Sequence, residues 1–112
     1  EKKQLSYLPV RKAMEYVENN YMEKIGLEEI AKYVGLNASY FSALFKKETG
    51  KNFLSYLTEI RINHAKELLR ITNDTMSSIA EKVGYADARY FSQCFEKMVG
   101  MKPSLFRKLY TK

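Results

Sequence analysis

Tryptophan is absent from this 112-residue sequence, and cysteine occurs once, at Cys94. A single cysteine excludes an internal disulfide and a zinc site built on paired cysteines, and it fits a reducing cytoplasm. Long apolar runs are also lacking, because no stretch of eighteen residues is free of charge, so no membrane span is expected. The N-terminal residues are polar and contain no signal peptide. These absences predict a soluble, cytoplasmic protein without a membrane partner.

Residues for chemistry are equally scarce. His64 is the single histidine, and no second histidine or carboxylate cluster suggests a metal site or a catalytic triad. No nucleophile–base pair or phosphate-binding loop can be assembled. We therefore expect no enzyme activity, no metal and no cofactor, with His64 at a surface or interface and Cys94 as an inert core thiol.

Basic residues exceed acidic ones, with 19 Lys and Arg against 13 Asp and Glu, a formal charge of +6 and a pI near 9.4. That balance is typical of nucleic-acid-binding domains, although a ribosome-associated or membrane-surface domain can carry the same excess. The length suffices for one compact domain or two very small subdomains. Charge alone leaves the partner open.

Apolar residues recur with helical periodicity almost throughout, and no sustained alternation indicates a strand, so the fold class is all-α. We expect a first helix from Pro9 to Met22, because proline at a helix start has no N–H to leave unpaired. Further helices are predicted over 27–34, from a cap at Asn37 or Ser39 to Gly50, and over 53–71. Tyr40 is expected on the buried face of the helix that ends at Gly50.

The second half of the sequence repeats the first. Four residues recur at an offset of 49 (79 − 30), namely Ile30, Ala31, Val34 and Gly35 as Ile79, Ala80, Val83 and Gly84. Six more recur at an offset of 50 (90 − 40), namely Tyr40, Phe41, Ser42, Phe45, Lys47 and Gly50 as Tyr90, Phe91, Ser92, Phe95, Lys97 and Gly100. The added residue falls in a turn, where insertions are tolerated.

Each copy therefore predicts a short helix, a glycine-bearing turn and a longer helix, which is helix-turn-helix geometry. A small residue, Ala31 or Ala80, allows the two helices to approach closely. Two phenylalanines one turn apart anchor the second helix to the core. One copy is also compatible with a plain packed helical hairpin, whereas two copies joined by a long helix favour a tandem DNA reader.

The helix between the copies, at about 1.5 Å per residue, spans about 30 Å. Successive major grooves on one face of DNA lie about 34 Å apart. We therefore expect two reading helices in adjacent major grooves. The predicted divisions are a tether over 1–8, a first helix-turn-helix subdomain over 9–51, a linker helix over 52–72 and a second helix-turn-helix subdomain over 73–112.

The second copy also matches a long family signature. It reads Ile79-Ala80-x-x-Val83-Gly84-Tyr85-x-Asp87-x-x-Tyr90-Phe91-Ser92-x-x-Phe95-x-Lys97-x-x-Gly100-x-x-Pro103-x-x-Phe106-Arg107, and it resembles the signature of AraC/XylS transcription regulators. The preceding Tyr56-Leu57-x-x-x-Arg61-Ile62-x-x-Ala65-x-x-Leu68-Leu69 looks like that family's linker helix. Phe106 replaces the usual tyrosine, and Phe53 stands where the second copy has Pro103.

The resemblance implies seven helices in a homeodomain-like arrangement of two helix-turn-helix subdomains. It implies a bacterial transcription factor, typically an activator, that binds double-stranded promoter DNA and acts with RNA polymerase. It further implies that an N-terminal sensory or dimerisation domain lies elsewhere in the full protein. The alternative is a helical protein-interaction module, which binds a protein partner and no DNA.

The outer faces of the reading helices supply the predicted DNA contacts. Arg89 suits guanine and Gln93 suits adenine. The remaining base-reading candidates are Tyr90, Ser39, Ser42 and Ala43. The phosphate candidates are Lys46, Lys47, Lys51, Lys97, Lys102, Arg107 and Lys108. Arg61 is expected to pair with Glu59 or Glu29, or to orient the two subdomains.

Overall fold

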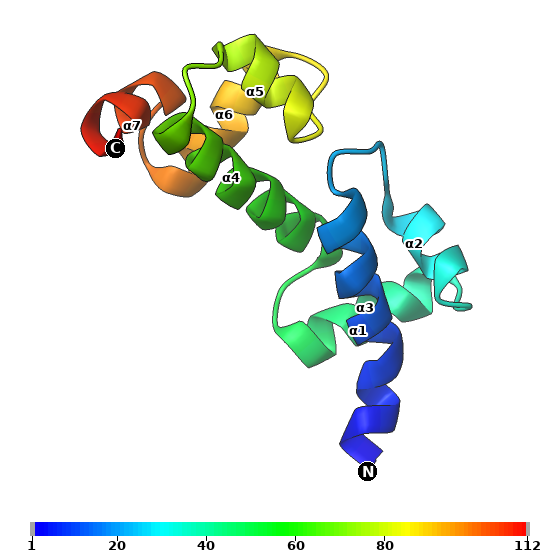
Figure 1. Ribbon diagram of the computed structural model, residues 1–112. Helices are drawn as coiled ribbons and strands as arrows, with labels where there is room; N and C mark the ends of the chain where they lie inside the picture. The colour runs from blue at the N-terminus through cyan, green and yellow to red at the C-terminus, as the bar shows by residue number, and fades with distance from the viewer. Residues whose placement is uncertain (1, 112) are drawn as a thin grey trace. The chain divides into compact units, whose positions relative to one another are not determined.

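The computed structural model describes the backbone of residues 2–111 and the side chains of residues 8–111. Over this range it contains helices and no strands, which confirms the all-α class (Figure 1). The seven expected helices are present. They are α1 (Lys2–Asn20), α2 (Leu27–Tyr33), α3 (Ala38–Thr49), α4 (Phe53–Ile71), α5 (Met76–Lys82), α6 (Ala88–Val99) and α7 (Pro103–Tyr110).

The first helix differs from the prediction at both ends. It begins at Lys2, so residues 2–8 are helical and not the expected tether, and Pro9 lies inside the helix. An internal proline removes one backbone hydrogen bond but does not compel the helix to begin there. The helix ends at Asn20, two residues early, where the Asn20 amide donates to the Tyr16 carbonyl at 2.9 Å.

The chain folds as two compact units, Glu1–Leu57 and Thr58–Lys112, and their boundary falls inside α4. The first turns of α4 therefore belong to the core of unit 1, and the remainder belongs to unit 2. The sequence-based division assigned the whole of α4 to a separate linker. An amphipathic helix buries its apolar stripe wherever a core is available, so it need not be a free rod.

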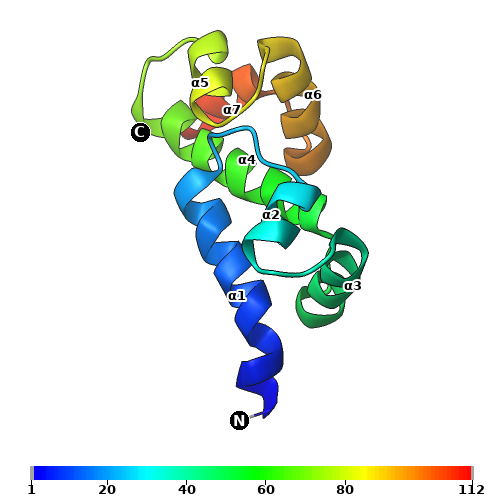
Figure 2. The same cartoon turned by 90° about the vertical axis from the view of Figure 1, so that its right-hand side faces the viewer.

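In unit 1, α1, α2 and α3 pack against one another (Figures 1 and 2). Their core is a cluster of aromatic rings. Phe41 and Phe45 of α3 are fully buried. Phe53 of α4 meets both rings edge-on, with centroids 5.8 and 5.5 Å away. The side chains that close this core are Val10, Ala13, Val17, Ile30, Ala31, Tyr56 and Leu57.

Unit 2 repeats the arrangement with α5, α6 and α7 (Figure 2). Phe91 and Phe95 of α6 are fully buried, and Phe106 of α7 meets Phe95 edge-on at 5.5 Å. From α4 come Ile62, Ala65 and Leu69, and from α5 come Ile79 and Ala80. Each unit thus buries an equivalent phenylalanine pair, on α3 in unit 1 and on α6 in unit 2. The opposite face of each of these helices is exposed to solvent.

No helix in the described part of the chain combines the length and the apolar character that a membrane crossing requires.

The glycines that end α3 and α6 are predicted to raise the free energy of unfolding. Gly50 has φ +82 and open space around it, whereas the equally open Gly26 has φ −140. Gly50→Ser is expected to lower the free energy of unfolding by about 1 kcal/mol, because an L side chain disfavours the left-handed region. Gly26→Ser is the matched control and should cost nothing, since serine caps helices well in extended backbone. Urea unfolding of both variants measures the difference, and equal losses would contradict the prediction.

Candidate nucleic-acid interface

The turn between the two helices has the same hydrogen bonds in both units. In unit 1 the N–H of Gly35 donates to Lys32 O at 3.1 Å, and that of Leu36 donates to Ala31 O at 2.9 Å. In unit 2 Gly84 and Tyr85 repeat these bonds, at 3.1 and 2.8 Å. This pattern is a Schellman motif. Its central glycine needs a positive φ, and Gly35 and Gly84 have φ +80 and +104.

Both reading helices are capped in the same way. The Asn37 side chain accepts the N–H of Tyr40 at 2.8 Å, and the Asp87 side chain accepts that of Tyr90 at 2.7 Å. Asn37 is therefore the cap of α3, and Ser39 is not. Each helix then runs for 12 residues to a left-handed glycine, Gly50 or Gly100. The inserted residue of the second copy, Ala86, lies in the turn before the cap, as predicted.

The predicted base-reading residues differ in exposure. Arg89, Gln93, Ser39 and Ala43 are exposed on the outer faces of α6 and α3. Ser42 is half-buried in a shallow hollow of about 510 Å³ that also borders Leu27, at the start of α2, and Lys46. Ser42 therefore has less access to a partner than its neighbours on the helix.

Tyr40 and Tyr90 are both exposed to solvent, although the sequence predicted a buried position for Tyr40. Tyr40 was predicted on the buried face of α3, yet its side chain is 58% exposed. The equivalent Tyr90 is 57% exposed. Phe41 and Phe45 already fill the inner face, so the neighbouring position points away from the core. Helical periodicity alone does not decide whether Tyr40 is buried or exposed, because Tyr40 lies at the border of the apolar stripe.

Six of the seven predicted phosphate contacts are exposed lysines, and one of these, Lys108, lies in the last turn of α7. Lys46 and Lys47 occupy the last turn of α3, and Lys97 occupies the last turn of α6. Lys51 and Lys102 follow the two left-handed glycines directly. Cations in a last helical turn interact favourably with the helix dipole, which stabilises Lys46, Lys47 and Lys97 in these positions.

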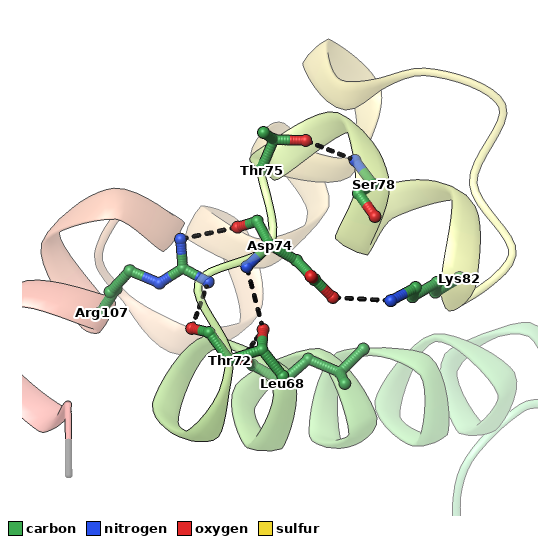
Figure 3. A network of polar contacts seen from close by, with 7 residues as sticks. All are labelled: Leu68, Thr72, Asp74, Thr75, Ser78, Lys82 and Arg107. Carbon is green, nitrogen blue, oxygen red and sulfur yellow. Dashed lines mark hydrogen bonds and ion pairs between the residues drawn. The ribbon is translucent and has the colours of Figure 1, made fainter.

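Arg107 has a different role from the one predicted (Figure 3). Its guanidinium donates to three backbone carbonyls, those of Leu69 at 3.1 Å, Asp74 at 2.7 Å and Thr72 at 3.0 Å. These carbonyls belong to the end of α4 and the turn after it. The side chain is half-buried and ties α7 to that turn. Because all three nitrogens of its guanidinium donate to backbone carbonyls, Arg107 is not proposed as a phosphate contact.

The same turn is held from its other side (Figure 3). The Lys82 ammonium and the Asp74 carboxylate lie 2.7 Å apart, and this hydrogen bond lowers the pKa of Asp74. The Thr72 hydroxyl accepts the N–H of Asp74, and the Thr75 hydroxyl accepts the N–H of Ser78 at the start of α5. The sequence signalled a turn here through its cluster of small polar residues, but it gave no indication of Arg107 as the partner.

Arg61 lies above an aromatic ring. Its guanidinium carbon is 5.6 Å from the ring centre of Tyr85, a distance that allows a cation–π contact. Burial lowers the pKa of Arg61. The Tyr85 ring in turn contacts Tyr90 at 5.7 Å and Phe91 at 5.6 Å. Arg61 thus contacts the ring that packs against the start of the reading helix α6. The sequence indicated a pair with Glu59 or Glu29, or a role in orienting the two subdomains, and did not indicate Tyr85 as a partner.

Cys94 and His64 are the remaining residues with reactive side chains. Cys94 is a free, half-buried thiol on α6, so it is less deeply buried than a core position would be. His64 is half-buried on α4. Among the described residues, no group of three histidine, cysteine, aspartate or glutamate side chains is arranged to hold a metal ion.

The two equivalent Schellman turns and the two capped helices define a tandem helix-turn-helix domain.

Known proteins share this architecture. Residues 30–109 match the sequence profile of a helix-turn-helix domain family. The lactose operon transcription activator of Staphylococcus xylosus is 37% identical over 98 residues, which are 88% of this chain and 35% of that protein. The chain covers 38%, 20% and 35% of the lengths of three curated relatives.

Two solved structures are similar in both fold and sequence. The C-terminal domain of AraT, a response regulator from Geobacillus stearothermophilus, is 34% identical with a TM-score of 0.91, covering 93% of this chain and 87% of that one. A transcriptional regulator of Chromobacterium violaceum with an AraC-type DNA-binding domain is 26% identical with a TM-score of 0.86, covering 96% of each chain. The chain belongs to the AraC/XylS family of helix-turn-helix DNA-binding domains, which confirms the resemblance.

Loss of the Arg107 side chain is expected to destabilise unit 2. Arg107→Ala should lower the free energy of unfolding by about 2 kcal/mol or more, because it removes three charge-assisted hydrogen bonds. Arg107→Lys should recover only part of this, since an ammonium lacks the planar fork. Lys108→Ala, at an exposed neighbouring position, is the control and should change stability by less than about 0.5 kcal/mol. Urea unfolding gives all three values, and a full recovery with lysine would argue against the fork geometry.

Proposed function

We propose that this chain binds double-stranded DNA in a sequence-specific way and regulates transcription, with α3 and α6 as the two reading helices. The observation that carries the proposal is the equivalence of these helices. Both have 12 residues, a side-chain cap, a left-handed glycine end and a buried phenylalanine pair that turns the opposite face outward. A braced helix with a polar outer face is the element that enters the major groove in this class of domain.

The outer face of α6 supplies the stronger base readers. Arg89 and Gln93 are exposed and one helical turn apart, so both reach the same groove. Arginine binds guanine with two parallel hydrogen bonds, and glutamine does the same for adenine. Each such pair contributes about 1 to 3 kcal/mol of discrimination against other bases.

The outer face of α3 is chemically simpler. Ser39 is a short donor and acceptor, and the Ala43 methyl suits the thymine methyl group. Half-buried Ser42 contributes less than these two. We expect the first unit to depend more on backbone contacts and DNA shape, and the second unit to read more of the sequence.

Electrostatic attraction brings the chain to DNA. The exposed lysines of the reading helices and of the turns after them supply part of a formal charge of +6. Each lysine that neutralises a phosphate releases condensed counterions, so binding should weaken as salt rises. We propose Lys46, Lys47, Lys51, Lys97 and Lys102 as these contacts.

We further propose that the chain acts as the DNA-binding part of a longer bacterial regulator. Support comes from its limited coverage of relatives that are named as transcription regulators. The proposed partners are promoter DNA, an N-terminal sensory or dimerisation domain, and RNA polymerase, and the proposed mode of action in the cytoplasm is activation. The two units are proposed to bind successive major grooves, about 34 Å apart.

The direct test is selection of binding sequences from a randomised duplex library at two salt concentrations. We expect a motif with two boxes about one helical turn apart. Recovery of no motif, together with binding that disappears at the higher salt, would leave only non-specific attachment to DNA. That outcome would favour the interaction of these helices with a protein partner instead.

Two substitutions separate base reading from phosphate binding. Arg89→Ala is expected to relax base preference at one defined position of the selected motif, with a loss of about 1 to 3 kcal/mol on the preferred base. Lys47→Ala should weaken binding to all sequences alike and reduce the slope of log affinity against log salt by about one. Competition assays on single-base variants of the motif measure both effects. Uniform losses from both substitutions would contradict the role of Arg89.

A further inference from the structure

The outer faces of α3 and α6 can be compared position by position, because the helices match in length and ends at an offset of 50. Three exposed positions of α3 differ between the copies: Ser39, Ala43 and Lys46 become Arg89, Gln93 and Glu96. Two exposed positions are the same: Tyr40 and Lys47 become Tyr90 and Lys97. The outer face of each helix therefore has a part that varies between copies and a part that does not.

These two parts occupy different sides of the helix. Residues seven apart are displaced by only about 20° around the axis, so Tyr40 and Lys47 share one side. Ser39 and Lys46 share the side next to it, and Ala43 lies between the two. The same holds for α6. We name the repeated pairs, Tyr40 with Lys47 and Tyr90 with Lys97, the tyrosine–lysine edge.

Packing does not account for the repeated tyrosine. Both side chains are more than half exposed, at 58% and 57%. The Tyr90 ring rests against Tyr85, whereas the position of Tyr85 (85 − 49) is held by Leu36 in unit 1. A residue that served only its neighbours would be expected to change when they do. The tyrosine stays the same while its surroundings differ, which indicates an outside partner.

A tyrosine hydroxyl is protonated at neutral pH, and it can donate one hydrogen bond and accept others. In unit 2 the Tyr90 hydroxyl is hydrogen-bonded to the Cys94 side chain, which raises the pKa of Tyr90, so a phosphate oxygen would take the place of the thiol as the acceptor. A tyrosine hydroxyl is among the groups that bind phosphate oxygens in protein–DNA complexes, and a nearby ammonium strengthens the attraction for the anion.

We infer that the tyrosine–lysine edge binds the DNA sugar-phosphate backbone in both units, through the tyrosine hydroxyl and the lysine ammonium. The three positions that differ then read the bases. This inference rests on the proposed function and deepens it. It adds Tyr40 as a DNA contact, moves Tyr90 from base reading to backbone binding, and moves Lys46 from the phosphate set to the reading side.

The test uses Tyr40→Phe, Tyr90→Phe and the double variant, which lose the hydroxyl and keep the ring. Binding is measured to the duplex selected above and to a mixed-sequence duplex of equal length at low salt. Each single change is expected to weaken binding to both duplexes by the same factor, about five- to tenfold, and to leave the selected motif unchanged. Tyr110→Phe, a half-exposed tyrosine on α7, is the matched control and should leave both affinities unchanged.

Other outcomes overturn the inference. Unchanged affinity in the double variant would mean that the edge does not touch DNA through its hydroxyls. A changed base preference at one position would assign that tyrosine to base reading. Failure of the proposed function is distinguished from failure of this inference by the selection experiment, because that experiment uses the unsubstituted chain. If that chain selects no motif but its affinity for mixed-sequence DNA falls with the Tyr→Phe changes, the backbone contact stands and sequence-specific reading fails.

Discussion

The buried phenylalanine pair of each reading helix fixes everything that the helix can present to a partner. Phe41 with Phe45, and Phe91 with Phe95, lie one turn apart and are fully buried. Once one face of a helix is packed in this way, its rotation about its own axis is determined. The opposite face must then be the exposed one. The identity of the outer residues is free to differ between copies, because none of them contributes to the core.

Backbone hydrogen bonds set the second constraint, which is where each helix begins and ends. The Schellman turns at Gly35 and Gly84 and the caps at Asn37 and Asp87 satisfy backbone groups that a short helix would otherwise leave unpaired. Unit 2 adds the Arg107 guanidinium, which binds three carbonyls at the end of α4 and in the turn before α5. One side chain thereby links α7 to the base of the second helix-turn-helix.

The two units consequently have the same scaffold and different surfaces. α6 presents an arginine and a glutamine where α3 presents a serine and an alanine, while a tyrosine and a lysine occur on both. In the binding mode that we propose, the repeated tyrosine and lysine hold DNA in both units, and the positions that differ read its bases. The duplication allows these two proposed roles to be told apart inside one chain, because the repeated pair lies among neighbours that differ between the copies.

The sequence by itself determined the all-α class, the duplication, the site of the inserted residue and the family, because helical periodicity, glycine turns and a repeated motif are local patterns. It did not determine the start of α1, since Pro9 is compatible with a helix end and with a helix interior. Nor did it place Tyr40, at the border of the apolar stripe, or assign Arg107 and Arg61. Arg107 binds carbonyls more than thirty residues away, and Arg61 covers the Tyr85 ring. Only the tertiary structure decided these roles, because a partner distant in sequence leaves no periodic trace.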